Sequence, residues 1–188
     1  METMRLGLVY LPDEVSSQRC VELSQALVRG REARVVLGEG RWPHVTLLHV
    51  ETAAAAAELW AEAKDALPAT LPMAFAALAF LPYERPYNAP ATMGAPPATM
   101  AYVIVPCTAA LRSAEERALA LSFVQRAEIT TGNGDRFMPH VTAALWEGEV
   151  GPAQVLLGRG AIEREVSGTL ALGVIGAHGV YARTLFGG

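Results

Sequence analysis

The stretches Arg41-Trp42-Pro43-His44-Val45-Thr46 and Arg136-Phe137-Met138-Pro139-His140-Val141-Thr142 end in the same four residues, Pro-His-Val-Thr. The chain has 188 residues and only four histidines. Two of these histidines occupy matched positions in the two phrases, 96 residues apart (140 minus 44). A phrase that recurs after about half the chain length indicates an internal repeat. The two copies therefore predict a chain built from two related halves.

The similarity between the halves extends beyond the histidine phrases. Leu6–Pro12 and Met100–Pro106 are short apolar runs that end in proline, and each predicts a buried strand. A helix is expected after each strand, over Ser16–Arg29 in the first half and from a cap at Thr108 in the second. Each half then reaches its histidine phrase, where alternating apolar residues favour another strand.

Further elements are expected after the histidine phrases. Thr52 is expected to cap the helix that follows the first phrase. The expected elements are a helix and a strand in each half and then a closing strand: Ala53–Leu67, Leu71–Phe80, 152–158, Thr169–Ile175 and Val180–Phe186. The sequence thus predicts an α+β fold with two pseudo-symmetric lobes, each from a β-α-β-α-β unit, and antiparallel sheets flanking a central cleft. We expect one bilobal domain over residues 1–188, with halves at approximately 1–95 and 96–188.

The segment Pro82–Thr99 joins the two halves. Its five prolines and one glycine predict an irregular loop that is too long for a simple turn. Two interpretations are open for this segment. It could be a linker only, or it could be a flap over the cleft in which Tyr83 and Tyr87 stack on a base.

Composition excludes several classes of protein. The formal net charge is −4, whereas proteins that grip long polyanions carry a basic surplus, so extended nucleic-acid binding is not expected. The most apolar stretch, Leu71–Leu81, is only long enough for a strand, and no membrane partner is expected. The first residues lack the pattern of a signal peptide, and two cysteines provide no disulfide framework. We expect a cytoplasmic monomer.

The spacing within each phrase places two functional side chains together. Residues i and i+2 of a strand point to the same face, so His44 projects beside Thr46, and His140 beside Thr142. A phosphodiester held between the two pairs could receive a proton from one histidine while the other histidine takes a proton from the nucleophile. An unperturbed imidazole pKa near 6.5 permits both protonation states. The threonine hydroxyls could stabilise charge on the non-bridging oxygens.

The phrases His44-Val45-Thr46-Leu47 and His140-Val141-Thr142 resemble those of the two-histidine (2H) phosphoesterase superfamily. That group includes the 2′-5′ RNA ligase-like proteins and the cyclic nucleotide phosphodiesterases. The resemblance covers essentially the whole chain, including the opening strand Arg5–Pro12 and the closing turn Gly176-Ala177-His178-Gly179. A departure occurs at Ala143-Ala144-Leu145-Trp146, where RNA ligase-like members often have a basic residue.

The resemblance implies a bilobal α+β fold with an active cleft between the lobes. It places His44, Thr46, His140 and Thr142 on the catalytic and phosphate-contacting positions of the family. The implied reaction is the opening of cyclic phosphodiesters, commonly 2′,3′-cyclic phosphates at RNA ends or on small nucleotides, without a metal or other cofactor.

Several other residues lie near the phrases or share their residue type. Arg41 and Arg136 could each hold phosphate oxygens or be solvated ends, and their offsets from the histidines, three and four residues, differ. His49 is expected on the opposite face of its strand from His44, and His178 is expected to be a turn residue outside the site. Neither phrase has an acidic residue at a spacing suited to a metal ligand, so no metal is expected.

The sequence therefore supports a metal-independent phosphoesterase that opens a cyclic (2′,3′-type) or 2′-linked phosphodiester of a nucleotide or RNA end. Because the halves are alike, either histidine could be the base. One alternative is a non-catalytic module that binds a phosphorylated nucleotide or RNA end in the same cleft. Another is a 2′-5′ RNA ligase, although the net charge of −4 provides little basic surface for RNA arms.

Overall fold

The structure is a computed structural model that describes residues 3–83, 98–148 and 164–188. Its α-helices are α1 (Glu14–Leu27), α2 (Ala56–Ala66) and α3 (Ala109–Leu119). Its strands are β1 (Met4–Pro12), β2 (Ala33–Val36), β3 (Val45–Thr52), β4 (Thr70–Phe75), β5 (Ala77–Pro82), β6 (Ala98–Ile104), β7 (Glu128–Ile129), β8 (His140–Glu147), β9 (Arg164–Ile175) and β10 (Tyr181–Gly187). The predicted α+β class is confirmed.

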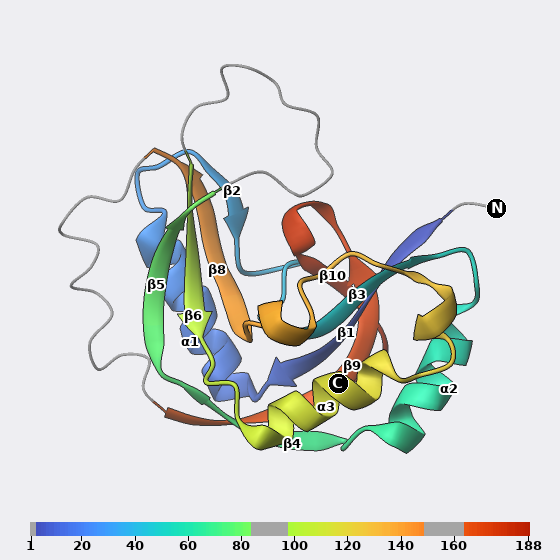
Figure 1. The fold of residues 1–188 in the computed structure, drawn as a ribbon. Coiled ribbons are helices and arrows are strands. Elements are labelled where there is room, and N and C mark those ends of the chain that lie inside the picture. The colour runs from blue at the N-terminus through green and yellow to red at the C-terminus, as the bar shows by residue number, and fades with distance from the viewer. Residues whose placement is uncertain (1–2, 84–97, 149–163) are drawn as a thin grey trace.

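The strands form two antiparallel sheets, and the larger one is curled (Figure 1). In this sheet β1 lies between β3 and β9, and β7 continues the sheet beyond β3. Successive parts of the long strand β9 pair with β4 and β10. The smaller sheet has the order β2-β8-β6-β5. Each sheet therefore combines strands from the first and the second half of the sequence.

Two short edge strands join different halves of the chain, and sequence periodicity did not predict them. The strand β2 follows α1 in the first half but pairs with β8 of the second half. The strand β7 follows α3 in the second half but pairs with β3 of the first half. Both strands contain at most four residues, too few for an alternating pattern to be recognised.

The three described helices cover the sheets on the outside of the molecule (Figure 1). The predicted cap of α3 is confirmed, because the Thr108 hydroxyl accepts a hydrogen bond from the Leu111 amide at 3.2 Å. The prediction that Thr52 caps α2 is wrong. The strand β3 continues through Thr52, whose Oγ1 accepts from the Ala54 amide, and α2 begins only at Ala56 without a side-chain cap. The predicted helix at 152–158 lies outside the described residues.

A single main cluster of buried apolar side chains connects both sheets with all three of these helices. Trp146, Tyr10 and Tyr181 are the largest fully buried side chains. Because one core serves both sheets, the described parts of the chain should unfold as one unit. Among these described residues, no helix combines the length and the apolar composition that a bilayer crossing requires.

Candidate functional site

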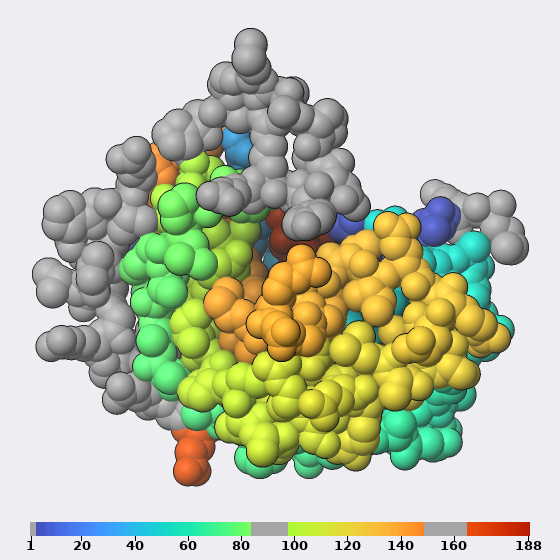
Figure 2. Space-filling view, in the orientation of Figure 1, coloured from blue at the N-terminus to red at the C-terminus, as the bar shows by residue number. Residues whose placement is uncertain are grey.

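Residues from both histidine phrases line one pocket, which has a volume of about 240 Å³. His44 and Thr46 reach it from the start of β3, and His140 and Thr142 reach it from β8. The structure therefore brings together the four side chains that the sequence placed in the site. Figure 2 shows a recess on this face of the molecule, between the green strands and the orange segment that precedes β8.

The two catalytic candidates have the same local geometry. His44 Nδ1 lies 3.0 Å from the Trp42 carbonyl oxygen, and His140 Nδ1 lies 2.7 Å from the Met138 carbonyl oxygen. A carbonyl can only accept, so each contact requires a proton on Nδ1. Both neutral imidazoles are thus held as the tautomer in which Nε2 is the basic nitrogen. A proline separates the histidine from the carbonyl in each phrase and restricts the backbone there.

Each motif strand has a bulge directly after its threonine. In β3, the pairing with β1 passes from Thr46 to Leu48 and skips Leu47. In β8, the pairing with β6 passes from Thr142 to Ala144 and skips Ala143. An extra residue in one strand reverses the alternation of side chains beyond it. Residues at odd offsets from the histidine therefore return to the pocket face.

The bulge in β3 corrects the prediction for His49. Strict alternation placed this residue on the face away from His44, but His49 lines the pocket. Its ring centroid is 6.5 Å from that of His44, and its Nε2 is 3.4 Å from Thr46 Oγ1. The matched position in β8 is Leu145, which is also 96 residues later (145 minus 49) and is fully buried. At this matched position, therefore, one side of the pocket has an imidazole and the other has leucine.

Burial keeps the pocket histidines neutral. Loss of solvent, with a smaller contribution from the neighbouring His140, lowers the pKa of His44 to about 4, against the backbone at Trp42 and Gly179, which favours the protonated form. Burial, together with His44, Arg5 and His140, lowers the pKa of His49 to about 3. Burial also lowers the pKa of His140, against its hydrogen bond to Met138. The empty pocket therefore holds uncharged imidazoles near neutral pH.

A buried carboxylate anchors the segment that leads into β8. Glu115 on α3 is fully buried, and its Oε1 accepts from the Gly134 amide at 2.7 Å and from Asn133 Nδ2 at 3.3 Å. Asn133 Nδ2 also donates to the Leu47 carbonyl at 2.9 Å, which is the carbonyl of the bulge residue in β3. Arg112 Nη1 donates to Glu115 Oε2 at 3.2 Å. This network holds the loop before His140 against the bulge after His44.

Substituting Glu115→Ala is expected to lower the free energy of unfolding by about 3 kcal/mol, because buried donors lose their acceptor. For a chain of this length the loss corresponds to a melting temperature lower by roughly 6–12 °C. Thermal unfolding followed by circular dichroism would measure it. Glu115→Gln is the matched control: it keeps one acceptor oxygen and should lose about half as much. Equal stability of the alanine variant and the parent would contradict a structural role for this network.

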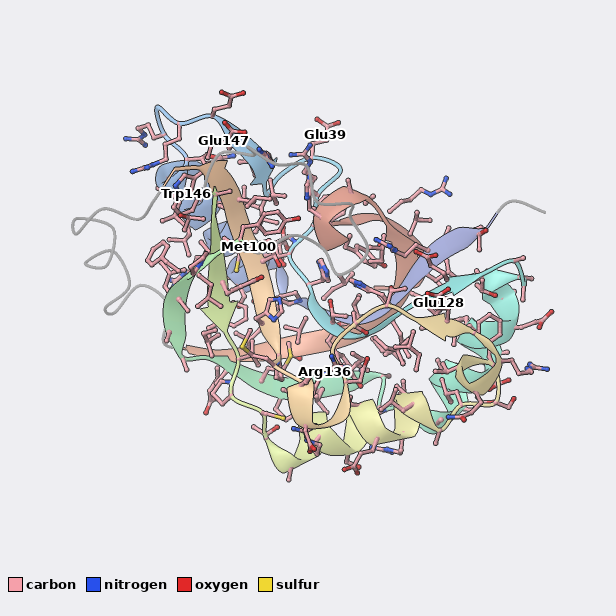
Figure 3. All side chains as sticks on the ribbon, turned by 45° about the horizontal axis from the view of Figure 1, so that its top comes forward. Glu39, Met100, Glu128, Arg136, Trp146 and Glu147 are labelled. Carbon is pink, nitrogen blue, oxygen red and sulfur yellow. The ribbon has the colours of Figure 1, made fainter. Side chains whose placement is uncertain are left out.

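The structure separates the two candidate arginines. Arg136 lies in the short helical turn Gly134–Arg136 and lines the pocket. Figure 3 labels it together with another lining residue, Met100 on β6. Arg41 is exposed and does not line the pocket; its Nη1 donates to the Arg34 carbonyl at 3.3 Å. Of the two, Arg136 is the one placed to contact a bound anion.

The aromatic candidates are placed differently from one another. Tyr83 reaches the pocket indirectly, since its hydroxyl oxygen is 3.0 Å from Nδ1 of the lining residue His178. His178 sits in a turn, as predicted, but it does contribute to the site, with a left-handed φ of 58° that is uncommon for residues other than glycine. Tyr87 lies outside the described residues. Tyr102 on β6 lines the pocket with its ring edge-on to His140, the two ring centroids being 4.3 Å apart.

The charge of the lining suits an anion. Among the described residues that line the pocket, the ionisable side chains are the histidines, Arg136 and Tyr102, and none is a carboxylate. Within residues 3–83, 98–148 and 164–188, no group of three histidine, cysteine or acidic side chains is arranged to hold a metal ion. The chemistry available from these residues is therefore proton transfer by imidazole and hydrogen bonding by hydroxyl, guanidinium and phenol groups.

Comparison of the sequence with protein-family models and with curated proteins gives no match.

Proposed function

We propose that this protein is a metal-independent phosphoesterase that opens a cyclic (2′,3′-type) or 2′-linked phosphodiester of a nucleotide or RNA end. The observation that carries the proposal is the convergence of two His-Thr pairs on one pocket, each histidine with its Nδ1 against a backbone carbonyl. Such a pair can accept a proton on one side of a phosphorus atom and donate a proton on the other. The resemblance of both phrases to those of 2H phosphoesterases agrees with this reaction.

We also propose that the fold is a duplicated β-α-β-α-β unit with a pseudo-twofold axis. Two observations support the duplication. The bulges at Leu47 and Ala143 occupy the same place relative to the two histidines. The pairing of β4 with β9 begins at Thr70 with Thr169 and ends at Phe75 with Arg164. If each residue of β4 is matched with the residue 94 positions later (164 minus 70, 169 minus 75), the first pair becomes the last pair. The two strands therefore pair as two copies of one strand would pair about a twofold axis. In this arrangement the axis passes through that pair of strands and relates His44 to His140.

In the proposed reaction, one histidine takes a proton from water as its oxygen attacks phosphorus. The other gives a proton to the ribose oxygen as its bond to phosphorus breaks, so one ester bond is exchanged for a phosphate hydroxyl. His44 is 6% exposed, and burial and the neighbouring His140 both disfavour its positive charge, which favours it as the base. His140 is less buried, and a bound phosphate anion would raise its pKa and allow it to act as the acid. Thr46, Thr142 and Arg136 would hold the non-bridging oxygens.

The test is turnover of a panel of nucleoside 2′,3′-cyclic phosphates and 2′-5′-linked dinucleotides, followed by separation of the products. The expected result is a single nucleoside monophosphate isomer from the cyclic substrates, at a rate that EDTA does not change. Tight binding of the panel without product would replace the proposal with a binding module. Joining of RNA ends without hydrolysis would replace it with a ligase.

The pH dependence of kcat/KM is expected to be bell-shaped, with its maximum on the acid side of neutrality. This parameter reports the free enzyme, in which the pKa of His44 is about 4 and that of His140 is below its ordinary value. The base must be neutral and the acid protonated, so activity requires a pH between the two values. Bound phosphate should shift the basic limb of the kcat profile to higher pH. A kcat/KM maximum above pH 7.5 would contradict this assignment.

We further propose that the protein acts in the cytoplasm as a monomer. Both cysteines are free thiols, Cys20 buried and Cys107 exposed, as is usual in a reducing compartment. Size-exclusion chromatography with light scattering would measure the oligomeric state.

A further inference from the structure

We propose that His49 is a positioning residue that donates a hydrogen bond from Nε2 to Thr46 Oγ1, so that the Thr46 hydroxyl hydrogen is left to point at the phosphate. The role of this bond in catalysis rests on the function proposed above. The bond itself can be tested without any substrate.

The backbone around His49 holds its ring in the pocket. The bulge at Leu47 turns the side chain toward Thr46, and the Nε2 to Oγ1 distance is 3.4 Å, long for a hydrogen bond but within its range. The His49 amide donates to Thr131 Oγ1 at 3.1 Å, and its carbonyl accepts from the Thr130 amide at 2.9 Å. These bonds link both backbone groups of His49 to the segment that precedes the second phrase. The imidazole is therefore placed by both halves of the chain.

Glycine on the neighbouring strand makes room for the ring. Gly7 of β1 is paired with His49, and a Cβ atom at Gly7 would lie 3.2 Å from His49 Cδ2 and 2.4 Å from Ile175 Cδ1. On another side, a Cβ atom at Gly179 would lie 3.7 Å from His49 Cε1. The ring is 8% exposed in this enclosure. An imidazole so confined has few orientations, which is the property that a positioning residue requires.

Each group can donate or accept in this contact, so the proposed direction is the one that leaves a hydrogen for the phosphate. A neutral imidazole has one N–H donor and one acceptor nitrogen, and a threonine hydroxyl has one hydrogen that it can donate once. If Thr46 donated to His49, its hydroxyl hydrogen would be turned away from the phosphate site. If His49 donates to Thr46, that hydrogen remains available for a phosphate oxygen. Burial and the basic neighbours of His49 keep its ring neutral, so the ring has one proton to place.

The second half of the chain provides a natural comparison. Leu145 stands where His49 would stand, and it cannot orient Thr142. Within the described residues, Thr142 Oγ1 has no hydrogen-bond partner. The two threonines are then unequal: Thr46 presents a fixed donor, whereas the Thr142 hydroxyl is free to rotate. His49 thus gives the Thr46 hydroxyl a fixed orientation that the Thr142 hydroxyl does not share.

The first test is ¹⁵N NMR of histidine-labelled protein, with the His49 signals assigned by their loss in His49→Gln. The expected spectrum shows a neutral ring that is protonated on Nε2 from pH 5 to pH 8, and a changed Nε2 shift in Thr46→Val. Protonation on Nδ1 instead, or a positive ring at pH 6, would overturn the inference. This result stands even if the protein cleaves none of the phosphodiesters offered, an outcome that would remove only the proposed function.

The second test compares the kcat and KM of variants with glutamine, asparagine or leucine at position 49. The glutamine amide can reach the place of Nε2, whereas the asparagine amide reaches only that of Nδ1. For the cyclic phosphate that the parent protein cleaves best, His49→Gln should keep kcat within threefold, while His49→Asn and His49→Leu should lower it about tenfold with KM within twofold. In a Thr46→Val background, His49→Leu should change kcat less than twofold. A tenfold loss in that background too, or equal rates for all three variants, would show that His49 does not act through Thr46.

Discussion

Replacing either His44 or His140 with alanine is expected to lower kcat for cyclic phosphodiester opening by about 10³- to 10⁴-fold. A positioned acid or base contributes roughly 10²- to 10⁴-fold, and here one substitution removes one of two proton transfers that must be coordinated in a single displacement. The two losses should not add, because the groups act as a unit. Steady-state assays on the best substrate of the panel would measure the single variants and the double variant.

The fold should survive both substitutions, because His140 lies at the start of its strand and His44 just before its own. Circular dichroism and melting temperature are the controls for folding. Thr130→Ala is a matched control for substitution near the site, since it removes a buried hydroxyl that has no hydrogen-bond partner among the described residues and does not line the pocket. Activity that persists in both single histidine variants would exclude two-histidine catalysis.

Acidification from pH 7 to pH 5 is expected to lower the free energy of unfolding by about 2 kcal/mol for each of two imidazoles, His44 and His49, or about 4 kcal/mol together. In the unfolded chain each imidazole takes up a proton near pH 6.5. In the folded protein uptake is delayed to about pH 4 for His44 and about pH 3 for His49. Between these values the unfolded state binds more protons, so stability is present above pH 6.5 and is lost as the pH falls.

Urea unfolding at pH 7, 6 and 5 would measure this slope. His49→Leu is the matched variant, since it keeps an apolar side chain of the kind found at Leu145 and should reduce the slope by about half. His178→Asn is the control, because His178 lies in a turn, is only partly buried and shares less of the burial that shifts the other two. A free energy of unfolding that does not change between pH 7 and pH 5 would show that the imidazoles are not held neutral.

Sequence reasoning located the elements whose signals are local. The strands β1 and β6 follow from their apolar runs, and the cap of α3 follows from Thr108, because each signal lies within the element itself. The strands β2 and β7 escaped detection because each is defined by a distant partner strand. The cap at Thr52 was misplaced for a related reason: pairing of β3 with β1 extends the strand to that residue.

The site was predicted to the extent that its residues share a repeated phrase. The repeated sequence and its spacing were enough to choose four site residues: His44, Thr46, His140 and Thr142. His49 could not be chosen in this way, because a bulge depends on the register between two strands and leaves no mark in the sequence of one of them. Tyr102 could not be chosen either, since it lies beside the register shift between β6 and β8. The histidine at position 49 was nevertheless visible, and a polar residue in an apolar strand was a usable signal.

The exchange of β2 and β7 between the sheets has a mechanical consequence. Each of these edge strands is hydrogen-bonded to a strand from the other half of the chain. The pairing of β4 with β9 adds a third connection between the halves. Moving the two histidines apart would therefore mean breaking backbone ladders, so the distance between them is set by covalent topology and hydrogen bonds together. Most of these pairings join residues remote in sequence, so we expect slow folding and a stiff pocket. Backbone pairing thus holds the two histidines at a fixed separation.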